Sequence, residues 1–153
     1  PRQPVSAVAS PRNALLKMLT YSKFIDTPNS VTVIEDFLEV AEDMMQKGTR
    51  GTYNVCNPGV TSPYQMALLL KELVDPSLVV EKISKDELNK MTFAERIDSV
   101  LDTSKLEAAG YHLKAIDVRL RELLPELKAS VAAHQEVLDA TNKETIAKLA
   151  LKN

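Results

Sequence analysis

Two amphipathic helical patterns with a strand-like run between them constrain the fold of this 153-residue chain most. The first pattern covers residues 35–47. The second begins at Ser62, where a capping box with proline at the first helical position predicts a helix start. The run between them, residues 51–56, is the best strand candidate. This helix–strand–helix order, with a turn rich in Asn, Pro and Gly, predicts an α/β unit at the edge of a mostly parallel sheet.

Short strands and further helices account for the rest of the prediction. Three apolar or β-branched runs indicate strands or extended segments, at residues 24–27, 31–34 and 78–83. Ser10-Pro11 is typical of a helix start, and further helices are expected from Ser84, over 103–109 and from 117 onward. A last capping box predicts a separate terminal helix over 141–152.

The helix expected from residue 117 carries an apolar seam with alternating spacings of four and three, from Leu120 to Leu138. Pro125 interrupts this seam and is expected to kink or end the helix. The seam fits either a tail helix packed on its own domain or a short coiled-coil dimer. We favour the tail helix.

Composition excludes several classes of protein. A net charge of -2 gives no overall attraction to nucleic acid or to an anionic membrane. The apolar stretches are too short to span a bilayer, and no signal-peptide pattern opens the sequence. One cysteine, Cys56, excludes an internal disulfide and fits a reducing, cytoplasmic location. It is expected to be a buried apolar residue rather than a nucleophile, and neither histidine has a ligand at metal-binding spacing.

Five short runs follow one another in an order that carries a family resemblance. They are residues 2–5 (Arg-Gln-Pro-Val), 11–13 (Pro-Arg-Asn), 28–33 (Pro-Asn-Ser-Val-Thr-Val), 57–59 (Asn-Pro-Gly), and Arg96 with 101–106 (Leu-Asp-Thr-Ser-Lys-Leu). Together they resemble the C-terminal, substrate-binding half of the extended short-chain dehydrogenase/reductases. The most similar subgroup contains dTDP-4-dehydrorhamnose reductase and the nucleotide-rhamnose epimerase/reductases.

The resemblance implies an α/β fold, the C-terminal part of an NAD(P)-binding Rossmann-like sugar-nucleotide reductase with few short strands, amphipathic helices and a helical C-terminal tail. Residues 1–128 would form the substrate-binding domain, without the nucleotide-binding domain, and residues 129–153 a helical extension. The run 11–13 would head a helix lining the sugar-nucleotide pocket.

The resemblance also implies site residues. Arg2, Asn13 and Arg96 are expected to bind the substrate, a nucleotide-diphosphate sugar, and Pro4 to contact the cofactor. A pyrophosphate carries two negative charges and is bound by arginine and amide donors. Many relatives place an arginine that contacts phosphate where this chain has Asn29. That departure weakens the likeness to the broader epimerase class and suits the rhamnose subgroup.

Each of these residues also has a structural alternative. Arg96 could instead form a surface ion pair with a neighbouring carboxylate; with the resemblance we favour a phosphate contact. Asn13 could equally be a simple helix-start residue, and Arg2 and Pro4 could only position a terminal segment. Asp102, near a serine and a lysine, is explained better as a helix cap than as a catalytic group.

The sequence lacks both parts of the machinery for hydride transfer. No glycine-rich strand–loop–helix site for a dinucleotide is present. None of the four tyrosines has a lysine four residues later, and no catalytic or metal-binding residue is assigned. Two hypotheses remain. The chain is either the substrate-binding portion of an NAD(P)-dependent nucleotide-sugar reductase or epimerase/reductase, inactive and without cofactor by itself, or a non-catalytic binding or regulatory module. Its expected partners are the nucleotide sugar and either the missing nucleotide-binding domain or a second copy.

Overall fold

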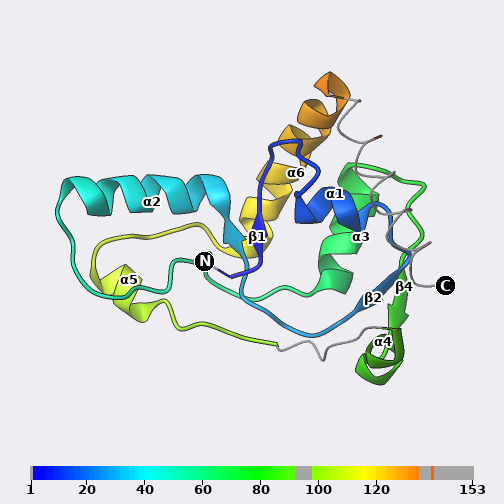
Figure 1. Cartoon of the computed structure of the whole chain (residues 1–153), viewed down its shortest axis with the longest axis horizontal. Helices are drawn as coiled ribbons and strands as arrows, with labels where there is room; N and C mark the ends of the chain where they lie inside the picture. Colours follow the sequence, from blue (N-terminus) through cyan, green and yellow to red (C-terminus); the bar gives the residue numbers. More distant parts are fainter. Residues whose placement is uncertain (1, 92–97, 135–138, 140–153) are drawn as a thin grey trace.

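The computed structural model describes residues 2–91, 98–134 and 139, and shows a mixed helix and strand fold (Figure 1). Two pairs of short parallel strands lie at its centre and at one end. β1 (Pro4–Val5) pairs with β3 (Thr32–Val33), and β2 (Lys23–Ile25) pairs with β4 (Glu81–Ile83). The parallel α/β character expected from the sequence is therefore present, although each strand has only two or three residues.

The predicted strand at residues 51–56 is wrong as a regular strand, although the segment lies beside β3. Two of the three hydrogen bonds described here between this segment and the β3 region have a side chain as one partner. The Asn57 amide donates to the Val31 carbonyl (3.0 Å), but the Thr32 hydroxyl donates to the Val55 carbonyl (3.0 Å). The Val33 amide donates to Asn57 Oδ1 (2.9 Å). A hydroxyl and a carboxamide thus replace ladder groups, so no β ladder forms.

The first helix begins later than predicted. α1 (Ala14–Met18) has Asn13, not Ser10, as its N-cap, and Asn13 Oδ1 accepts a hydrogen bond from the Leu15 amide at 2.9 Å. Ser10 instead closes a turn, in which its carbonyl accepts from the Asn13 amide. Both residues can cap a helix, and only the tertiary contacts of Asn13 decide between them.

Most of the other helix predictions are confirmed. α2 (Ile34–Gln46) and α3 (Pro63–Leu73) follow the two amphipathic patterns, and the Ser62 hydroxyl caps α3. α4 (Lys85–Met91) follows a complete capping box, in which Ser84 and Glu87 bond each other's backbone amides. α5 (Ser104–Ala108) follows Asp102, whose carboxylate accepts from the Ser104 amide.

The last described helix, α6 (Ile116–Ala133), runs through Pro125, so the helix does not end at that residue, and the alternative of a kink there stays a prediction. Proline in a helix costs about 3 kcal/mol through a lost hydrogen bond and a clash. Pro125 lies on the exposed face, whereas Leu124 and Leu127 beside it are buried, each contributing about 1.5–3 kcal/mol. Burial therefore outweighs the local cost.

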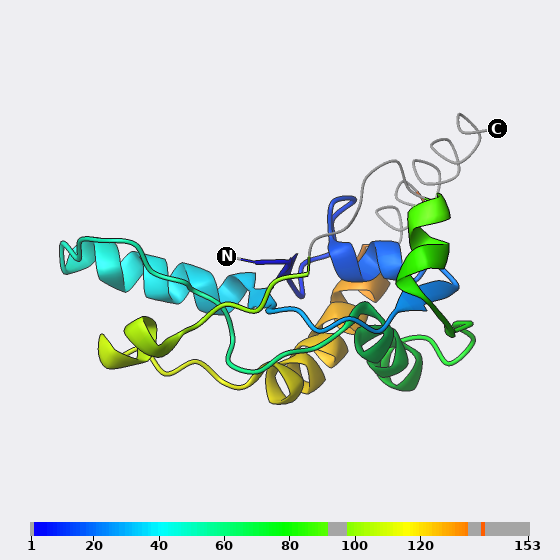
Figure 2. The same cartoon turned by 90° about the horizontal axis from the view of Figure 1, so that it is seen from below.

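α6 packs against α3, which confirms a helix packed on its own domain over the described part of the seam (Figures 1 and 2). α6 crosses position 128 without a break, and the domain boundary there stays a prediction. The helix predicted over 141–152 lies outside the described residues.

Two apolar clusters hold the molecule together. The larger, which we call the main core, joins α1, α3, α6 and the strands, with its side chains almost wholly buried. The smaller has three buried residues, Val40, Val55 and Leu106, between α2 and α5. We call α2, α5 and the segments beside them the arm, because they project from the rest of the molecule in both views (Figures 1 and 2). None of the helices in the described ranges is long and apolar enough to cross a membrane.

Candidate functional site

A groove of about 260 Å³ lies where β1 and β3 end. In parallel sheets ligands bind beyond the carboxyl ends of the strands, and this groove has that position, because the residues that directly follow each strand, Ser6 and Ile34, both line it. The lining is mostly apolar, with two hydroxyls, one carboxamide and one cation. The lining residues are Pro4, Val5, Ser6, Val8, Ser10, Arg12, Asn13, Ala14 and Ile34.

The backbone is strained where it enters the groove. Gln3 has a φ of 41°, in the left-handed region that non-glycine residues rarely adopt. It also precedes Pro4, a position that disfavours helical conformations. Strain of this kind costs on the order of 1–3 kcal/mol and clusters at functional sites. The residue next to this outlier is Pro4, the first residue of the groove lining.

Residues 6–10, which we call the groove segment, join β1 to α1 and form one wall of the groove. Ser6, Val8 and Ser10 line the groove, whereas Ala7 and Ala9 pack on the main core. The segment bends at Ala7 and Val8, and the two alanines anchor it to the main core while Val8 between them is exposed.

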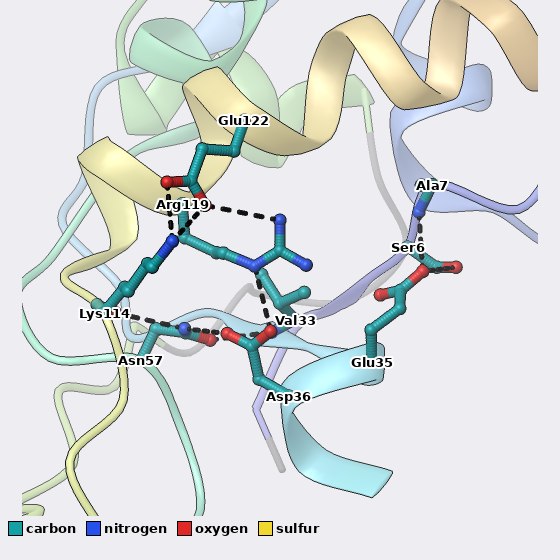
Figure 3. A network of polar contacts seen from close by, with 9 residues as sticks. All are labelled: Ser6, Ala7, Val33, Glu35, Asp36, Asn57, Lys114, Arg119 and Glu122. Atoms are coloured by element: carbon teal, nitrogen blue, oxygen red, sulfur yellow. Dashed lines mark hydrogen bonds and ion pairs between the residues drawn. The ribbon is translucent and has the colours of Figure 1, made fainter. Parts of the chain in front are cut away.

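Side chains from three helices hold the groove segment. Glu35 of α2 accepts from the Ser6 hydroxyl (2.7 Å) and from the Ala7 amide (2.9 Å), as Figure 3 shows. Ser130 of α6 accepts from the Ala9 amide at 3.0 Å. Asn13, at the start of α1, donates to the carbonyls of Ser6 and Val8, both at 2.8 Å. Two of these three side chains, Glu35 and Ser130, hold the wall without lining the groove.

Arg2 lies in a second group of polar contacts. Its Nη2 donates to Asn29 Oδ1 at 3.3 Å, and Asn29 Nδ2 donates to Asp98 Oδ1 at 3.3 Å. Asp98 also pairs with Lys85 at 3.2 Å. Burial opposes ionisation, but the hydrogen bonds from Lys85 and Asn29 hold the pKa of Asp98 below its ordinary value. Asn29 is 1% exposed and fastens the segment 98–99 beside the N-terminal strand.

A third network joins the arm to the main core (Figure 3). Asn57 Nδ2 donates to Asp36 Oδ2 (2.7 Å) and to the Lys114 carbonyl (3.1 Å). Asp36 Oδ1 accepts from Arg119 Nε of α6 at 2.9 Å, with both side chains mostly buried. Burial lowers the pKa of Arg119, but the hydrogen bond and the charge of Asp36 outweigh it and raise that pKa. We call Asp36, Asn57 and Arg119 the junction.

Comparison with known proteins places this arrangement in context. The chain is 31% identical over 135 residues to the bifunctional dTDP-4-dehydrorhamnose 3,5-epimerase/dTDP-4-dehydrorhamnose reductase of Arabidopsis thaliana, matching 86% of this chain and 45% of that protein. The crystal structure of a UDP-rhamnose synthase from Acanthamoeba polyphaga mimivirus has a TM-score of 0.75 and 29% identity, covering 81% of this chain and 43% of that one. The homologues of the present chain are thus nucleotide-rhamnose epimerase/reductases.

A further relative of this group is a trifunctional UDP-glucose 4,6-dehydratase/UDP-4-keto-6-deoxy-D-glucose 3,5-epimerase/UDP-4-keto-L-rhamnose-reductase of Arabidopsis thaliana. It is 33% identical over 69% of this chain and 16% of its own length. The chain thus spans less than half the length of each of these relatives. No family model matches the sequence.

Two of the runs on which the predicted resemblance rests take part in packing around β3. Run 28–33 and run 57–59 lie far apart in the sequence, and the structure brings them together at β3, where Asn57 bonds Val33 and Asn29 bonds Thr61. Asn29, noted in the sequence as a departure from a phosphate-contacting arginine, has its carboxamide occupied by Arg2, Asp98 and nearby backbone groups.

The predicted site residues fall into three places. Pro4 and Asn13 line the groove, and Asn13 also caps α1 and holds the groove segment, so its structural alternative is realised while its ligand role stays a prediction. Arg2 lies in the group around Asn29. Arg96 is outside the described residues, two positions before Asp98. Cys56 is buried, as predicted, and burial raises the pKa of its thiol.

Sequence reasoning missed Glu35 and Ser130, which hold the groove wall from 28 and 121 residues away. No local signal marks the wall itself, because residues 6–10 have no regular alternation of polar and apolar side chains and the chain bends at Ala7 and Val8. No group in the described ranges could hold a metal ion.

Proposed function

We propose that the chain is the substrate-binding part of an NAD(P)-dependent nucleotide-sugar reductase or epimerase/reductase of the rhamnose pathway, located in the cytoplasm. Its substrate would be dTDP- or UDP-4-keto-6-deoxyhexose. The observation that carries the proposal is the groove beyond β1 and β3, because the run 11–13 and Pro4, two features of the resemblance, both contribute to its lining. The nicotinamide cofactor would be held by a nucleotide-binding domain that this sequence does not contain.

The chemistry of the lining suits a deoxysugar. Val8, with 62% of its surface exposed, and Ile34 offer apolar contact for a methyl group. The Ser10 hydroxyl lies beside them as a hydrogen-bond partner for sugar hydroxyls, whereas the Ser6 hydroxyl already donates to Glu35 and can only accept from a ligand. Arg12 adds an exposed positive charge at the same wall, where an anionic pyrophosphate would approach.

A second candidate function is a non-catalytic binding module of the same superfamily. The arm favours it, because α2 carries exposed apolar side chains at Leu38 and Met45, 57% and 74% exposed. Residues seven apart share one face of a helix, which would bind a second protein or a second copy of this chain.

Titration of the chain with UDP-glucose and dTDP-glucose by calorimetry tests the first proposal. Arg96→Ala should raise Kd by about tenfold or more, since a charge-assisted hydrogen bond contributes about 1.5–3 kcal/mol. Arg96→Lys should restore only part of the affinity, because the planar fork is lost. Arg50→Ala, which removes an exposed arginine from the arm, is the matched control. Unchanged affinity in Arg96→Ala would contradict the phosphate role, and no binding by the wild type at millimolar ligand would contradict the groove as a sugar-nucleotide site.

An activity assay separates the two candidate functions. The chain alone should oxidise no NADPH in the presence of dTDP- or UDP-4-keto-6-deoxyglucose. Addition of a separately produced nucleotide-binding domain should restore turnover if the first proposal holds. Failure of every such pairing, together with concentration-dependent self-association in light scattering, would favour the non-catalytic module.

A further inference from the structure

We infer that Ser130 and Glu35 are positioning residues that set the shape of the sugar-nucleotide groove, an inference that rests on the proposed function. Neither residue lines the groove. Each accepts a hydrogen bond from a backbone amide of the groove segment, Ser130 from Ala9 and Glu35 from Ala7.

The two bonds act on alternate residues of the groove segment, which bends at Ala7 and Val8. The amides of Ala7 and Ala9 point to Glu35 and Ser130, and the side chains of these alanines pack on the main core. Val8 lies between the two held positions and is 62% exposed at the groove. Holding the amides of Ala7 and Ala9 therefore limits the directions that the Val8 side chain can take.

Asn13 completes the restraint from the other side of the peptide units. Its Nδ2 donates to the carbonyls of Ser6 and Val8, both at 2.8 Å. Between residues 6 and 9, two amides and two carbonyls are thus held by three side chains, from α2, α6 and the start of α1. No regular strand pairing of these residues is needed to keep the wall in place.

Ser130 gives α6 a role beyond packing. It lies past position 128, in the part of the chain predicted as a C-terminal extension, and 121 residues from Ala9. A bond between such distant positions makes the groove wall depend on the docking of α6 against the rest of the domain. The described C-terminal part of α6 then contributes to ligand affinity without touching the ligand.

The sharpest test compares Ser130→Val with Ser130→Thr, since the two side chains have nearly the same shape and only threonine keeps the hydroxyl. Calorimetry with UDP-glucose and dTDP-glucose should show Kd raised about fivefold in Ser130→Val, the factor expected for one lost hydrogen bond, and restored in Ser130→Thr. Amide hydrogen exchange of Ala9 should accelerate in Ser130→Val alone. Ser77→Ala, which removes a hydroxyl from an exposed turn, is the control and should leave both quantities unchanged.

A second matched pair serves if Ser130→Val does not fold. Glu35→Gln keeps an oxygen acceptor for Ser6 and Ala7, whereas Glu35→Met removes it. Affinity retained in Glu35→Gln and lowered in Glu35→Met supports the inference.

The outcomes separate this inference from the proposed function. Binding by the wild type with equal affinity in Ser130→Val and Ser130→Thr would overturn the positioning role alone. Absence of binding by the wild type would overturn the proposed function, and the positioning role with it.

Discussion

The main core and the arm are stabilised in different ways. The main core buries large apolar side chains from α3 and α6, with Leu70, Leu123 and Leu127 fully buried. The arm buries three, and polar contacts supply the rest: Tyr111 donates to Asp43 at 2.6 Å, and Lys105 lies 4.6 Å from the centre of the Tyr53 ring. Burial scales with apolar area, whereas exposed polar contacts contribute little each. The comparison teaches that the arm should open at a lower free energy than the main core.

The largest expected effect belongs to the main core. Leu124→Ala should lower the free energy of unfolding by about 3–4 kcal/mol, because it leaves a cavity where the side chain is 1% exposed. Urea unfolding followed by circular dichroism measures the loss. Val118→Ala on the same helix, at a side chain 49% exposed, is the control and should cost less than about 0.5 kcal/mol. Equal losses in the two variants would show that α6 is not the centre of the core.

The junction comes next, because it ties the two regions together. Asn57→Ala removes an acceptor from the Val33 amide and a donor from Asp36, and should cost about 2–3 kcal/mol in urea unfolding. Asn54→Ala removes one exposed bond to the Asp102 carbonyl and should cost well under half as much. A small effect of Asn57→Ala would mean that the arm and the main core are joined by packing rather than by this network.

A smaller, local effect is expected within the arm. Leu106→Ala should lower the opening free energy of arm amides by about 2 kcal/mol, the low end for such substitutions, because a small cluster at an edge can collapse around the space. Hydrogen exchange read residue by residue should show faster exchange in α2 and α5 and unchanged protection in α3. Equal acceleration in all three helices would show that the arm and the main core unfold as one unit.

The smallest effect is pH-dependent. Hydrogen bonds from Lys47 and Tyr111 hold the pKa of Asp43 below its ordinary value, and the bond to Asp43 raises the pKa of Tyr111. Because the folded pKa of Asp43 lies below the unfolded one, its contribution is complete above about pH 3.9 and is lost as pH falls through the folded pKa. Tyr111→Phe should therefore differ slightly from the wild type in thermal unfolding at pH 6 and match it at strongly acidic pH. A difference that persists in acid would assign the effect to packing of the ring.

The sequence predicted the elements whose signals are local. The apolar periods of α2 and α3 and the capping box at Ser84 depend on neighbours within a few positions, and they were correct. The predictions of a strand at residues 51–56 and of a helix end at Pro125 were wrong for the same reason. In both places the conformation is decided by residues that are distant in the sequence. Thr32 bonds the 51–56 segment, and the main core packs against the leucines beside Pro125; a pattern of neighbouring residues contains no information on either contact.

The candidate site divides in the same way. The resemblance pointed to the run 11–13 and to Pro4, and Arg12, Asn13 and Pro4 do line the groove. A resemblance in sequence can indicate a position without knowledge of its contacts. It did not point to Ser130, since one serine on a polar helix face carries no local signal. Asn13 was assigned two roles from the sequence; its partners Leu15 and Ser6 show the structural one, and the ligand role stays a prediction.

The side-chain pairing at the outer edge of β3 also bears on aggregation. An open strand edge offers a row of amides and carbonyls on which a foreign strand can assemble. Here the Asn57 carboxamide accepts from the Val33 amide and so occupies part of that row, while the Thr32 hydroxyl donates to the Val55 carbonyl and holds the neighbouring segment beside the edge. A chain with such short sheets is thereby guarded against fibril growth at its centre. Replacement of Thr32 by valine would preserve the shape of this edge and remove one of the bonds that hold the covering segment in place.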